Sequence, residues 1–413
     1  VIINENVLDI IGKNFKFDHA KGITEWLKNS VDAYNNSDFN DSDQIMIISL
    51  KIGANDYIKK ISVLDFHGMS KVKIDTAFKD WFSPDAAGLT NNLTKAANKT
   101  FGGHGNGGKF YMRQMFATSN AITYYKGRFN IFGFDKNKMY CFDNKATDID
   151  ITPTEAIGRA NLDEFNLSQE FIDKILNNKN GFGFTLIEGS NPIKSPGTNH
   201  KNKFISKLYG QPQAQRLINK KKIYIKLDGS AEIKQLQTKT IEPKIGFENP
   251  YEYSCNDTIE LMGDKIDMVN KNYPNPPKLI LYTSKEPLKG HTDQLNRIDI
   301  EGEVGVIASY KIEEIGKYSS SFTDFIYGEC FVPIMEDGDI DCVENDRDKL
   351  TDSPHSRALK FWIRECIEEL SQKMQDAEKD VKKKNALKNT ADFNTILNKW
   401  KNKFIDSIIR DVT

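Results

Sequence analysis

A dense cluster of glycines is the stretch of this sequence with the clearest chemical meaning. Residues 101–110 read FGGHGNGGKF, so five glycines fall within seven residues and a lysine follows directly. Ordered glycines cost conformational entropy, and such a cluster implies backbone amides that approach a ligand closely or adopt positive φ. Successive amides form a concave anion site, which the positive end of a following helix strengthens. The pattern predicts a phosphate-binding loop made of Gly102, Gly103, His104, Gly105, Asn106, Gly107, Gly108 and Lys109.

Two other interpretations of the glycine cluster are a flexible linker and a Walker A loop. Linkers are usually mixtures of glycine and serine without flanking aromatic residues. Residues 103–109 do match G-x-x-x-x-G-K, but that motif also needs Ser or Thr after the lysine and an apolar strand before the first glycine. This chain has Phe110 after the lysine and the polar stretch TKAANKT at 94–100 before the cluster. A phosphate site of another architecture is therefore expected.

A second set of polar residues lies upstream, in the segment ITEWLKNSVDAY at 23–34. Its apolar residues recur at spacings of three and four, which predicts a helix with one buried face, capped by Thr24. Glu25, Asn29 and Asp32 then follow one another along a neighbouring face. The Glu25 carboxylate could position a water molecule, and the Asn29 amide oxygen could ligate Mg²⁺, which takes oxygen ligands. A polar helix face in solvent is the alternative.

Another carboxylate, Asp65, lies at the end of a predicted strand and is followed by the turn-forming residues FHGMS. A buried aspartate there could accept a hydrogen bond from the exocyclic amine of a ligand, since an unpaired buried carboxylate is costly. An ordinary Asp/Gly turn is the alternative, and His67 is expected to be a turn residue. Further along, Thr185 enters an apolar strand, where its hydroxyl could touch the same site or simply favour the strand.

The elements that must position these residues follow from the spacing of apolar residues. The expected strands of the first half lie at 44–52, 58–65, 121–125 and 128–134, and the expected helices at 23–34, 70–80, 109–116 and 166–176. Residues 81–100 are polar and irregular, which is typical of a lid or binding loop. That stretch leads directly into the glycine cluster.

In this order, the four segments resemble the motifs of the GHKL ATPase superfamily, which includes gyrase, heat-shock-90-type chaperones, histidine kinases, MutL and the MORC ATPases. Glu25 to Ala33 resembles the family's N box, and Asp65 to Met69 its adenine-binding turn. Gly102 to Gly108 resembles the glycine-rich end of the ATP lid, and Gly183 to Thr185 the last motif. The resemblance covers residues 1 to about 190 and implies a Bergerat-type α/β sandwich that binds nucleotide.

The resemblance also implies roles for individual residues. Glu25 would be the general base, Asn29 a Mg²⁺ ligand on the same face as Asp32, and Asp65 the acceptor of the adenine amine. The adenine pocket would be lined by Gly68 and Met69, with Thr185 supporting Asp65. The phosphates would meet the amides of glycines 103, 105, 107 and 108, with Lys109 as the nearest cation.

Two departures from the family's patterns refine this expectation. The adenine turn usually reads Asp-x-Gly-x-Gly-Met, whereas this chain has DFHGM at 65–69, which is one residue shorter and one glycine poorer. Glu25 stands where histidine kinases typically carry asparagine, which favours hydrolysis over phosphate transfer to protein.

The second half of the chain predicts an α+β domain rich in strands. The expected strands lie at 221–227, 230–236, 258–262, 278–283, 297–309 and 322–333. The resemblance implies a transducer domain that lends a basic residue to the γ-phosphate, where it would stabilise developing charge. Arg347, in the segment CVENDRDKL at 342–350, is the candidate, and Lys349 is the alternative because some members use lysine. A surface arginine in a charged loop is the remaining interpretation.

Two helices are expected at the C-terminal end, from Asp352 or Ser353 through about 384 and from 391 to 412. Helices with this much surface charge usually pack as hairpins or coiled coils. The lysine run 382–384 could touch nucleic acid, and a solvated face is the alternative. The expected domains are a nucleotide-binding domain at 1–195, a transducer-like domain at 196–352 and a helical region at 353–413.

Composition limits the remaining possibilities. At 413 residues the chain is long enough for two or three domains, and its 57 basic and 58 acidic side chains give no overall electrostatic argument for nucleic-acid binding. Five widely separated cysteines suggest neither a disulfide framework nor a zinc site and suit a reducing cytosol. No apolar run approaches the ~20 residues of a membrane helix. A cytoplasmic protein without a membrane partner is expected.

The expected function is Mg²⁺-dependent ATP hydrolysis that drives lid closure and dimerisation. Such a protein would be a conformational switch acting on DNA or on a protein client. ATP and Mg²⁺ are the expected cofactors, and a homodimer that forms on nucleotide binding is the expected assembly. Three alternatives stay open: a scaffold that senses ATP without significant turnover, a DNA-clamping ATPase of MORC or MutL type, and a protein kinase.

Overall fold

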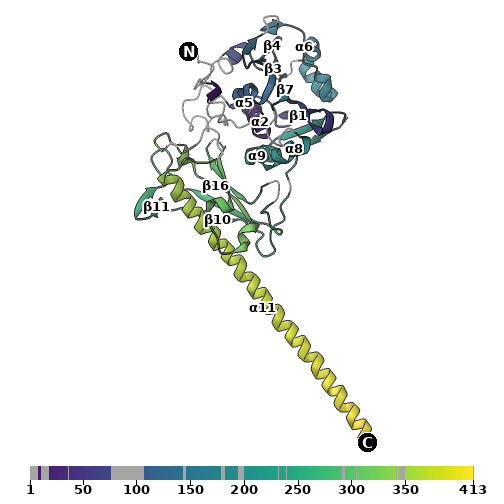
Figure 1. The fold of residues 1–413 in the computed structure, drawn as a ribbon, viewed down its shortest axis with the longest axis vertical. Coiled ribbons are helices and arrows are strands. Elements are labelled where there is room, and N and C mark those ends of the chain that lie inside the picture. The colour runs from purple at the N-terminus through teal and green to yellow at the C-terminus, as the bar shows by residue number, and fades with distance from the viewer. Residues whose placement is uncertain are drawn as a thin grey trace.

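The chain folds into two units, each built on its own sheet, and a long helix extends from the second unit (Figure 1). The computed structural model describes residues 8–10, 18–35, 37–75, 107–142, 146–177, 182–193, 200–230, 232–238, 240–290, 294–303, 305–340, 342–343 and 349–412. Each unit has a separate cluster of buried apolar side chains. The α+β class expected from the sequence is confirmed.

The first unit contains a mixed sheet to which nine strands of the described chain belong. Their order is β5-β4-β3-β7-β2-β1-β8-β9, with β6 paired to β4. Neighbours are antiparallel except for β1 and β8, which run parallel. The strands are β1 (Ile45–Ile52), β2 (Ile58–His67), β3 (Phe116–Tyr125), β4 (Arg128–Phe134), β5 (Tyr140–Phe142), β6 (Ile149–Asp150), β7 (Phe182–Pro192), β8 (Lys222–Leu227) and β9 (Ile233–Gln235).

Helices pack on both faces of this sheet. Successive residues of a strand point to opposite faces, so Asp65 in β2 faces α2 whereas the ring of Phe66 lies 4.5 Å from that of Phe171 in α7. On the Asp65 side, α2 also contacts α5, α8 and α9. The helices are α2 (His19–Asn35), α3 (Lys71–Lys73), α5 (Gly107–Met115), α6 (Pro153–Ala160), α7 (Gln169–Leu176), α8 (Lys201–Gly210) and α9 (Pro212–Lys220).

The helix expected at 23–34 is present as α2, and it begins earlier. Asp18 rather than Thr24 caps it, because the Asp18 carboxylate accepts the amides of Ala20 and Lys21 at 3.0 and 3.2 Å. The Thr24 hydroxyl instead donates to the Ala20 carbonyl at 2.8 Å inside the helix. The expected apolar face is fully buried, which fixes α2 against the sheet.

Two strands predicted for the second domain pair in the first sheet. β8 lies parallel to β1, with Ile48 opposite Ile225, and β9 pairs with β8. The chain from α8 to β9 thus packs with the first unit in this structure. The domain limits drawn at 195 and 352 stay a prediction. No helix within the described ranges is both long enough and apolar enough to span a bilayer.

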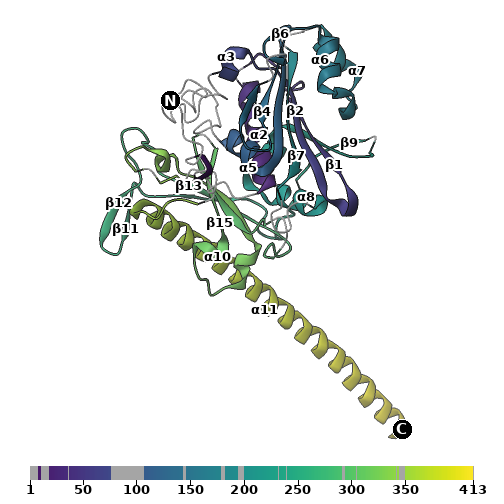
Figure 2. The same cartoon turned by 45° about the horizontal axis from the view of Figure 1, so that its top comes forward.

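The second unit has a five-stranded sheet in the order β10-β13-β16-β14-β15 and a separate hairpin of β11 and β12, counted over the described residues. Figure 2 shows this sheet beside the start of α11. The elements are β10 (Tyr251–Ser254), β11 (Thr258–Leu261), β12 (Asp264–Asp267), β13 (Lys278–Thr283), β14 (Arg297–Gly302), β15 (Gly305–Lys311), α10 (Ile312–Ile315), β16 (Ile326–Phe331) and α11 (Pro354–Val412).

The C-terminal end is one continuous helix of 59 residues, so the prediction of two helices is wrong. Neither glycine nor proline follows Pro354, and nothing therefore breaks the helix. Its start is capped reciprocally, because the Ser356 amide donates to the Ser353 hydroxyl at 3.1 Å and the Ser353 amide donates to the Ser356 hydroxyl at 3.0 Å. Apolar residues from Ala358 to Met374 pack in the second core, whereas all residues from 379 to 404 are exposed.

Candidate functional site

The expected site residues lie where α2, the end of β2 and the start of α5 meet. Trp26 joins two of these elements, because its indole Nε1 donates to the Gly108 carbonyl at 3.2 Å and its ring stacks on Phe116 with centroids 5.6 Å apart. Tyr34 joins α2 to the strands: its hydroxyl accepts the Phe66 amide at 2.8 Å and donates to the Ile45 carbonyl at 2.7 Å. These buried contacts fix the polar face of α2 relative to the other two elements.

The structure brings Glu25 and Asn29 against the first residues of α5. A Cβ atom placed on Gly107 would lie 3.1 Å from Oε2 of Glu25, and one on Gly108 would lie 2.6 Å from Nδ2 of Asn29. Only a residue without a side chain leaves Asn29 in its observed position. The carboxylate and the amide therefore lie beside amides at the amino end of a nine-residue helix, which is an environment that favours anions.

Glu25 also forms an ion pair that the sequence did not predict. Oε1 of Glu25 lies 2.9 Å from Nζ of Lys28, and the side chains are 21% and 8% exposed. Both residues belong to α2, three positions apart, so the pair needs no other element. Asn29 is exposed and Asp32 is half-buried on the same helix.

Asp65 is buried and hydrogen-bonded through both carboxylate oxygens. Oδ2 accepts the Ser30 hydroxyl at 2.6 Å, and Oδ1 accepts the His67 amide at 2.9 Å. Both bonds favour the charged form, yet burial has the larger effect and raises the pKa of Asp65 to about 7. The carboxyl thus titrates near neutral pH at the place where the sequence predicts an adenine contact.

The residues after Asp65 form a compact network with β3 and β7. The Met69 amide donates to the Thr123 hydroxyl at 2.7 Å, and the Thr185 hydroxyl donates to the His67 carbonyl at 2.7 Å. Thr185 lies directly opposite Asp65 in the strand register, although its hydroxyl bonds to His67. The network holds the end of β2 in a defined position.

Gly68 and His67 both have structural explanations. A Cβ on Gly68 would lie 2.0 Å from the Tyr124 carbonyl oxygen, so the close approach of β3 requires glycine. His67 is the last residue of β2 rather than a turn residue. Burial lowers the pKa of His67 to about 4, so its imidazole is neutral at physiological pH.

Lys349 lies in the second unit, and its ammonium group contacts other residues of that unit. Its Nζ donates to the Ser309 carbonyl at 2.9 Å and to Glu314 at 2.5 Å, and it lies 4.5 Å from the centre of the Tyr310 ring. These partners belong to β15 and α10. Lys109 is described and buried. The remaining predicted residues lie outside the described residues: Gly102, Gly103, His104, Gly105, Asn106 and Arg347.

Sequence reasoning placed Trp26 and Ser30 on the buried face of α2 but missed what their polar atoms do. A buried indole N–H or hydroxyl needs a partner; these two find Gly108 and Asp65. That requirement was the available signal, although it could not identify the partner. Lys28 was also missed, and its spacing of three from Glu25 was the signal.

No protein-family model matches the chain, and no curated protein matches it. Among solved structures, it is similar to the crystal structure of an N-terminal domain of a DNA repair protein. The TM-score is 0.47 and the sequence identity 12%, over 90% of this chain and 99% of the other. We draw nothing about function from a likeness of this degree.

Proposed function

We propose that this chain is an ATPase of the GHKL type, which binds ATP with Mg²⁺ between α2, β2 and the start of α5. One observation carries the proposal: Glu25 and Asn29 lie directly against Gly107 and Gly108. A carboxylate and an amide supply oxygen ligands that suit Mg²⁺, and glycine backbone amides at a helix start suit phosphate oxygens. The Bergerat-type sandwich implied by the sequence has its nucleotide site at the same combination of motifs.

The proposed roles divide among the three elements. On α2, Glu25 would accept the proton of the attacking water, and the Asn29 amide oxygen would hold Mg²⁺, which would supply neutralisation of phosphate charge. At the end of β2, Asp65 accepts the adenine amine. The amides at the start of α5 receive the phosphates.

The expected consequence of turnover is conformational. Nucleotide binding would close the lid predicted at 81–100, which lies outside the described residues, and would pair the nucleotide-binding units of two protomers. Hydrolysis would reverse both steps. A DNA or protein client receives this change. The basic residue that reaches the γ-phosphate is Arg347 or Lys349. If it is Lys349, this residue must first leave Glu314.

Phosphate release and nucleotide binding, measured together, test the proposal. Glu25→Gln keeps the size of the side chain but removes its basicity, so we expect binding to persist while Mg²⁺-ATP turnover falls by about two to four powers of ten. Glu232→Gln, at an exposed carboxylate in the turn before β9, is the matched control and should leave both unchanged. Equal turnover in wild type and Glu25→Gln would show that Glu25 is not the general base. If the wild type did not bind nucleotide, the proposed site would be wrong.

A second candidate is a scaffold that binds ATP without turnover, and the Lys28–Glu25 ion pair favours it. A carboxylate held by an ammonium group is a weaker proton acceptor than one that faces water alone. The same experiment separates the two functions, because a scaffold binds nucleotide in both forms and neither form releases phosphate.

A further inference from the structure

The exposed part of α11 carries an apolar stripe on one face. The distal stripe, as we name it, consists of Phe393, Ile396, Leu397, Trp400 and Phe404, and each of these side chains is more than half exposed. At about 100° per residue, the five lie within roughly 100° of the helix circumference. Five large apolar side chains on one face of a solvated helix are typical of a surface that docks on another surface.

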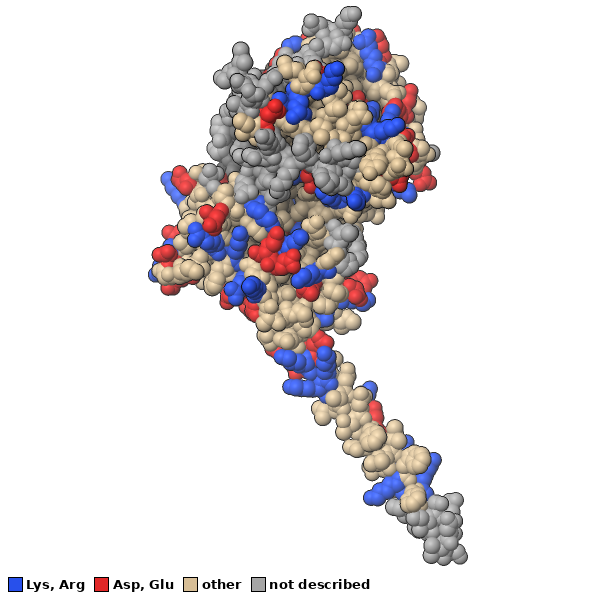
Figure 3. Space-filling view, in the orientation of Figure 1, with Lys and Arg blue, Asp and Glu red and all other residues tan. Residues whose placement is uncertain are grey.

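Lysines border the distal stripe on both sides. Lys399 and Lys403 follow one edge and Lys401 the other, and all three are exposed. Figure 3 shows tan surface and blue patches alternating along this part of the helix. Only one acidic residue, Asp392, occurs between 381 and 404. The stripe is therefore suited to an apolar surface with acidic side chains at its edge.

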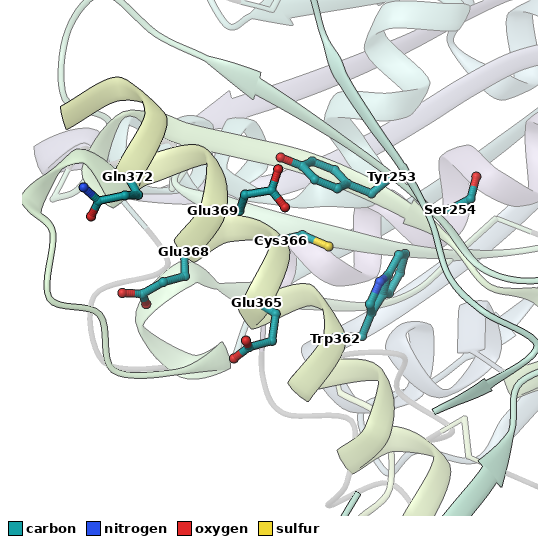
Figure 4. A pocket seen from close by; sticks show the side chains of 8 residues that line it. All are labelled: Tyr253, Ser254, Trp362, Glu365, Cys366, Glu368, Glu369 and Gln372. Carbon is teal, nitrogen blue, oxygen red and sulfur yellow. The ribbon is translucent and has the colours of Figure 1, made fainter. Parts of the chain in front are cut away.

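The same chain presents such a surface at the other end of α11. A hollow of about 550 Å³ lies between β10 and the helix and is lined by Tyr253, Ser254, Trp362, Glu365, Cys366, Glu368, Glu369 and Gln372. Figure 4 shows Trp362, Cys366 and Glu369 directed toward Tyr253, with Glu365 and Glu368 along the outer side of the helix. We name it the acid-edged hollow.

The carboxylates of the acid-edged hollow differ in the ion pairs and hydrogen bonds that they form. Glu369 pairs with Lys373 at 2.6 Å, and Glu368 accepts the Ser319 hydroxyl at 3.0 Å. Within the described residues, no ion pair is formed by Glu365. The hollow also contains the Tyr253 hydroxyl, which is buried and has no hydrogen-bond partner among those residues. The aromatic side chains, the glutamates and the unsatisfied hydroxyl together suit a helix that presents tryptophan and lysine.

We propose that the distal stripe of one copy docks in the acid-edged hollow of a second copy, with Trp400 as the anchor. A chain cannot fill its own hollow, because Cys366 and Trp400 lie about 50 Å apart on one continuous helix. Reciprocal docking places two α11 helices antiparallel and gives a closed, two-fold dimer. This self-association needs no nucleotide and does not rest on the proposed ATPase activity.

The antiparallel arrangement also brings the two lysine runs at 382–384 near each other. Acidic residues at 376, 378 and 380 lie within one or two turns, and two of them already pair with Lys379 and Lys382. The acidic residues offset the repulsion in part. Charge pairing between Lys399, Lys401 or Lys403 and the glutamates of the hollow must supply the remaining specificity.

Light scattering across a range of protein concentrations, without nucleotide, tests the proposal. The wild type should approach twice the mass of one chain as concentration rises. Trp400→Ala should raise the dimer dissociation constant by about thirty-fold or more, as loss of a buried aromatic anchor does. Leu387→Ala is the matched control, since Leu387 is an equally exposed apolar residue of α11 outside the distal stripe.

A charge exchange identifies the partner surface. One variant, Glu365→Lys/Glu369→Lys, reverses the charge at the edge of the hollow. A second variant, Lys399→Glu/Lys401→Glu/Lys403→Glu, reverses the charge along the border of the stripe. Each variant alone should be monomeric, and an equal mixture should dimerise again, because every stripe in the mixed pair then faces a hollow of opposite charge. Glu232→Lys is the control for charge reversal alone. A monomeric wild type, or a Glu365→Lys/Glu369→Lys variant that dimerises as the wild type does, would overturn the proposal.

Discussion

Two opposing effects set the pKa of the Asp65 carboxyl. Its two hydrogen bonds stabilise the carboxylate, and its burial destabilises the same charge more strongly. The pKa of about 7 is the outcome. A ligand amine that donated to this group would favour the charged form and lower the pKa again. Binding of such a ligand would therefore release protons near neutral pH.

The raised pKa predicts the direction in which stability changes with pH. The pKa of Asp65 in the folded protein lies above the unfolded value of 3.8, so between these two pKa values the folded protein binds a proton that the unfolded chain has lost. The contribution of Asp65 to the free energy of unfolding therefore falls as pH rises from about 4 to about 7. Asp65→Asn cannot ionise and should escape that loss, which amounts to at most about 1.4 kcal/mol per pH unit.

Urea unfolding of both proteins at about pH 5.5 and about pH 7.5 measures this effect. The free energy of unfolding of Asp65→Asn, relative to that of the wild type, should be higher at the higher pH than at the lower. The asparagine can still accept one hydrogen bond and donate another to the Ser30 hydroxyl, so the fold should be retained. A stability difference that stays constant between the two pH values would contradict the raised pKa.

At the scale of elements, the start of α5 offers a test that separates binding from stability. Gly108→Ala places a methyl group where it would lie 2.6 Å from Nδ2 of Asn29, so Asn29 must move. We expect the dissociation constant for Mg²⁺-ATP to rise by about tenfold or more, equal to about 1.4 kcal/mol of binding energy. Stability should change by less than about 1 kcal/mol, because alanine favours a helix over glycine and the obstructing atom ends a flexible side chain.

Gly158→Ala is the control for this substitution. Gly158 lies in α6, and nothing lies within 4 Å of a Cβ placed there. That variant should bind nucleotide as the wild type does and be more stable by about 0.5–1 kcal/mol. If isothermal titration gave the same affinity for Gly108→Ala and Gly158→Ala, the start of α5 would not be part of the nucleotide site.

Local patterns in the sequence predicted those elements whose stability is itself local. The face of α2 around Trp26 and the strand β4 appear where apolar spacing placed them. The parallel pairing of β8 with β1 could not be predicted, because the paired residues lie 177 positions apart in the sequence and no local signal records the contact. The continuity of α11 was present in the sequence as the lack of any breaker after Pro354, and the prediction wrongly ended a first helix at about 384.

The candidate site shows the same division. Helical spacing predicted Glu25 and Asn29 on one face of α2, and the structure adds that both lie against Gly107 and Gly108. The ion pair of Glu25 with Lys28 depends on side-chain conformation, which spacing permits but does not fix. Likewise, the glycine at 68 was predicted to serve a ligand, whereas packing against Tyr124 already requires it.

At the scale of the whole molecule, polar contacts join the two units through α9. Arg216 forms an ion pair with Glu301 of β14, and Gln215 accepts a hydrogen bond from Arg297 at 2.6 Å. Burial raises the pKa of Glu301 even with the Arg216 guanidinium beside it. The interface therefore contains a carboxylate whose charge depends on a cation from the other unit.

Removing that cation should destabilise the molecule more than removing an exposed one. Arg216→Met leaves Glu301 without its partner at a mostly buried position, and we expect a loss of about 2 kcal/mol, somewhat below the range for fully buried pairs. The double variant Arg216→Met/Glu301→Gln should recover most of the lost stability. Arg159→Met breaks the exposed pair with Glu155 and should cost less than about 1 kcal/mol. Equal losses for Arg216→Met and Arg159→Met in chemical unfolding would show that the interface is solvated.

The exposed length of α11 gives the molecule a lever arm. Its first turns are packed in the second core, and residues 379–404 extend beyond it for about 40 Å. A rotation of the second unit by about 10° would move the far end by about 7 Å. Small changes at the contacts with α9 would thus be amplified into a displacement that fluorescent labels, one on the first sheet and one near residue 404, can follow in real time.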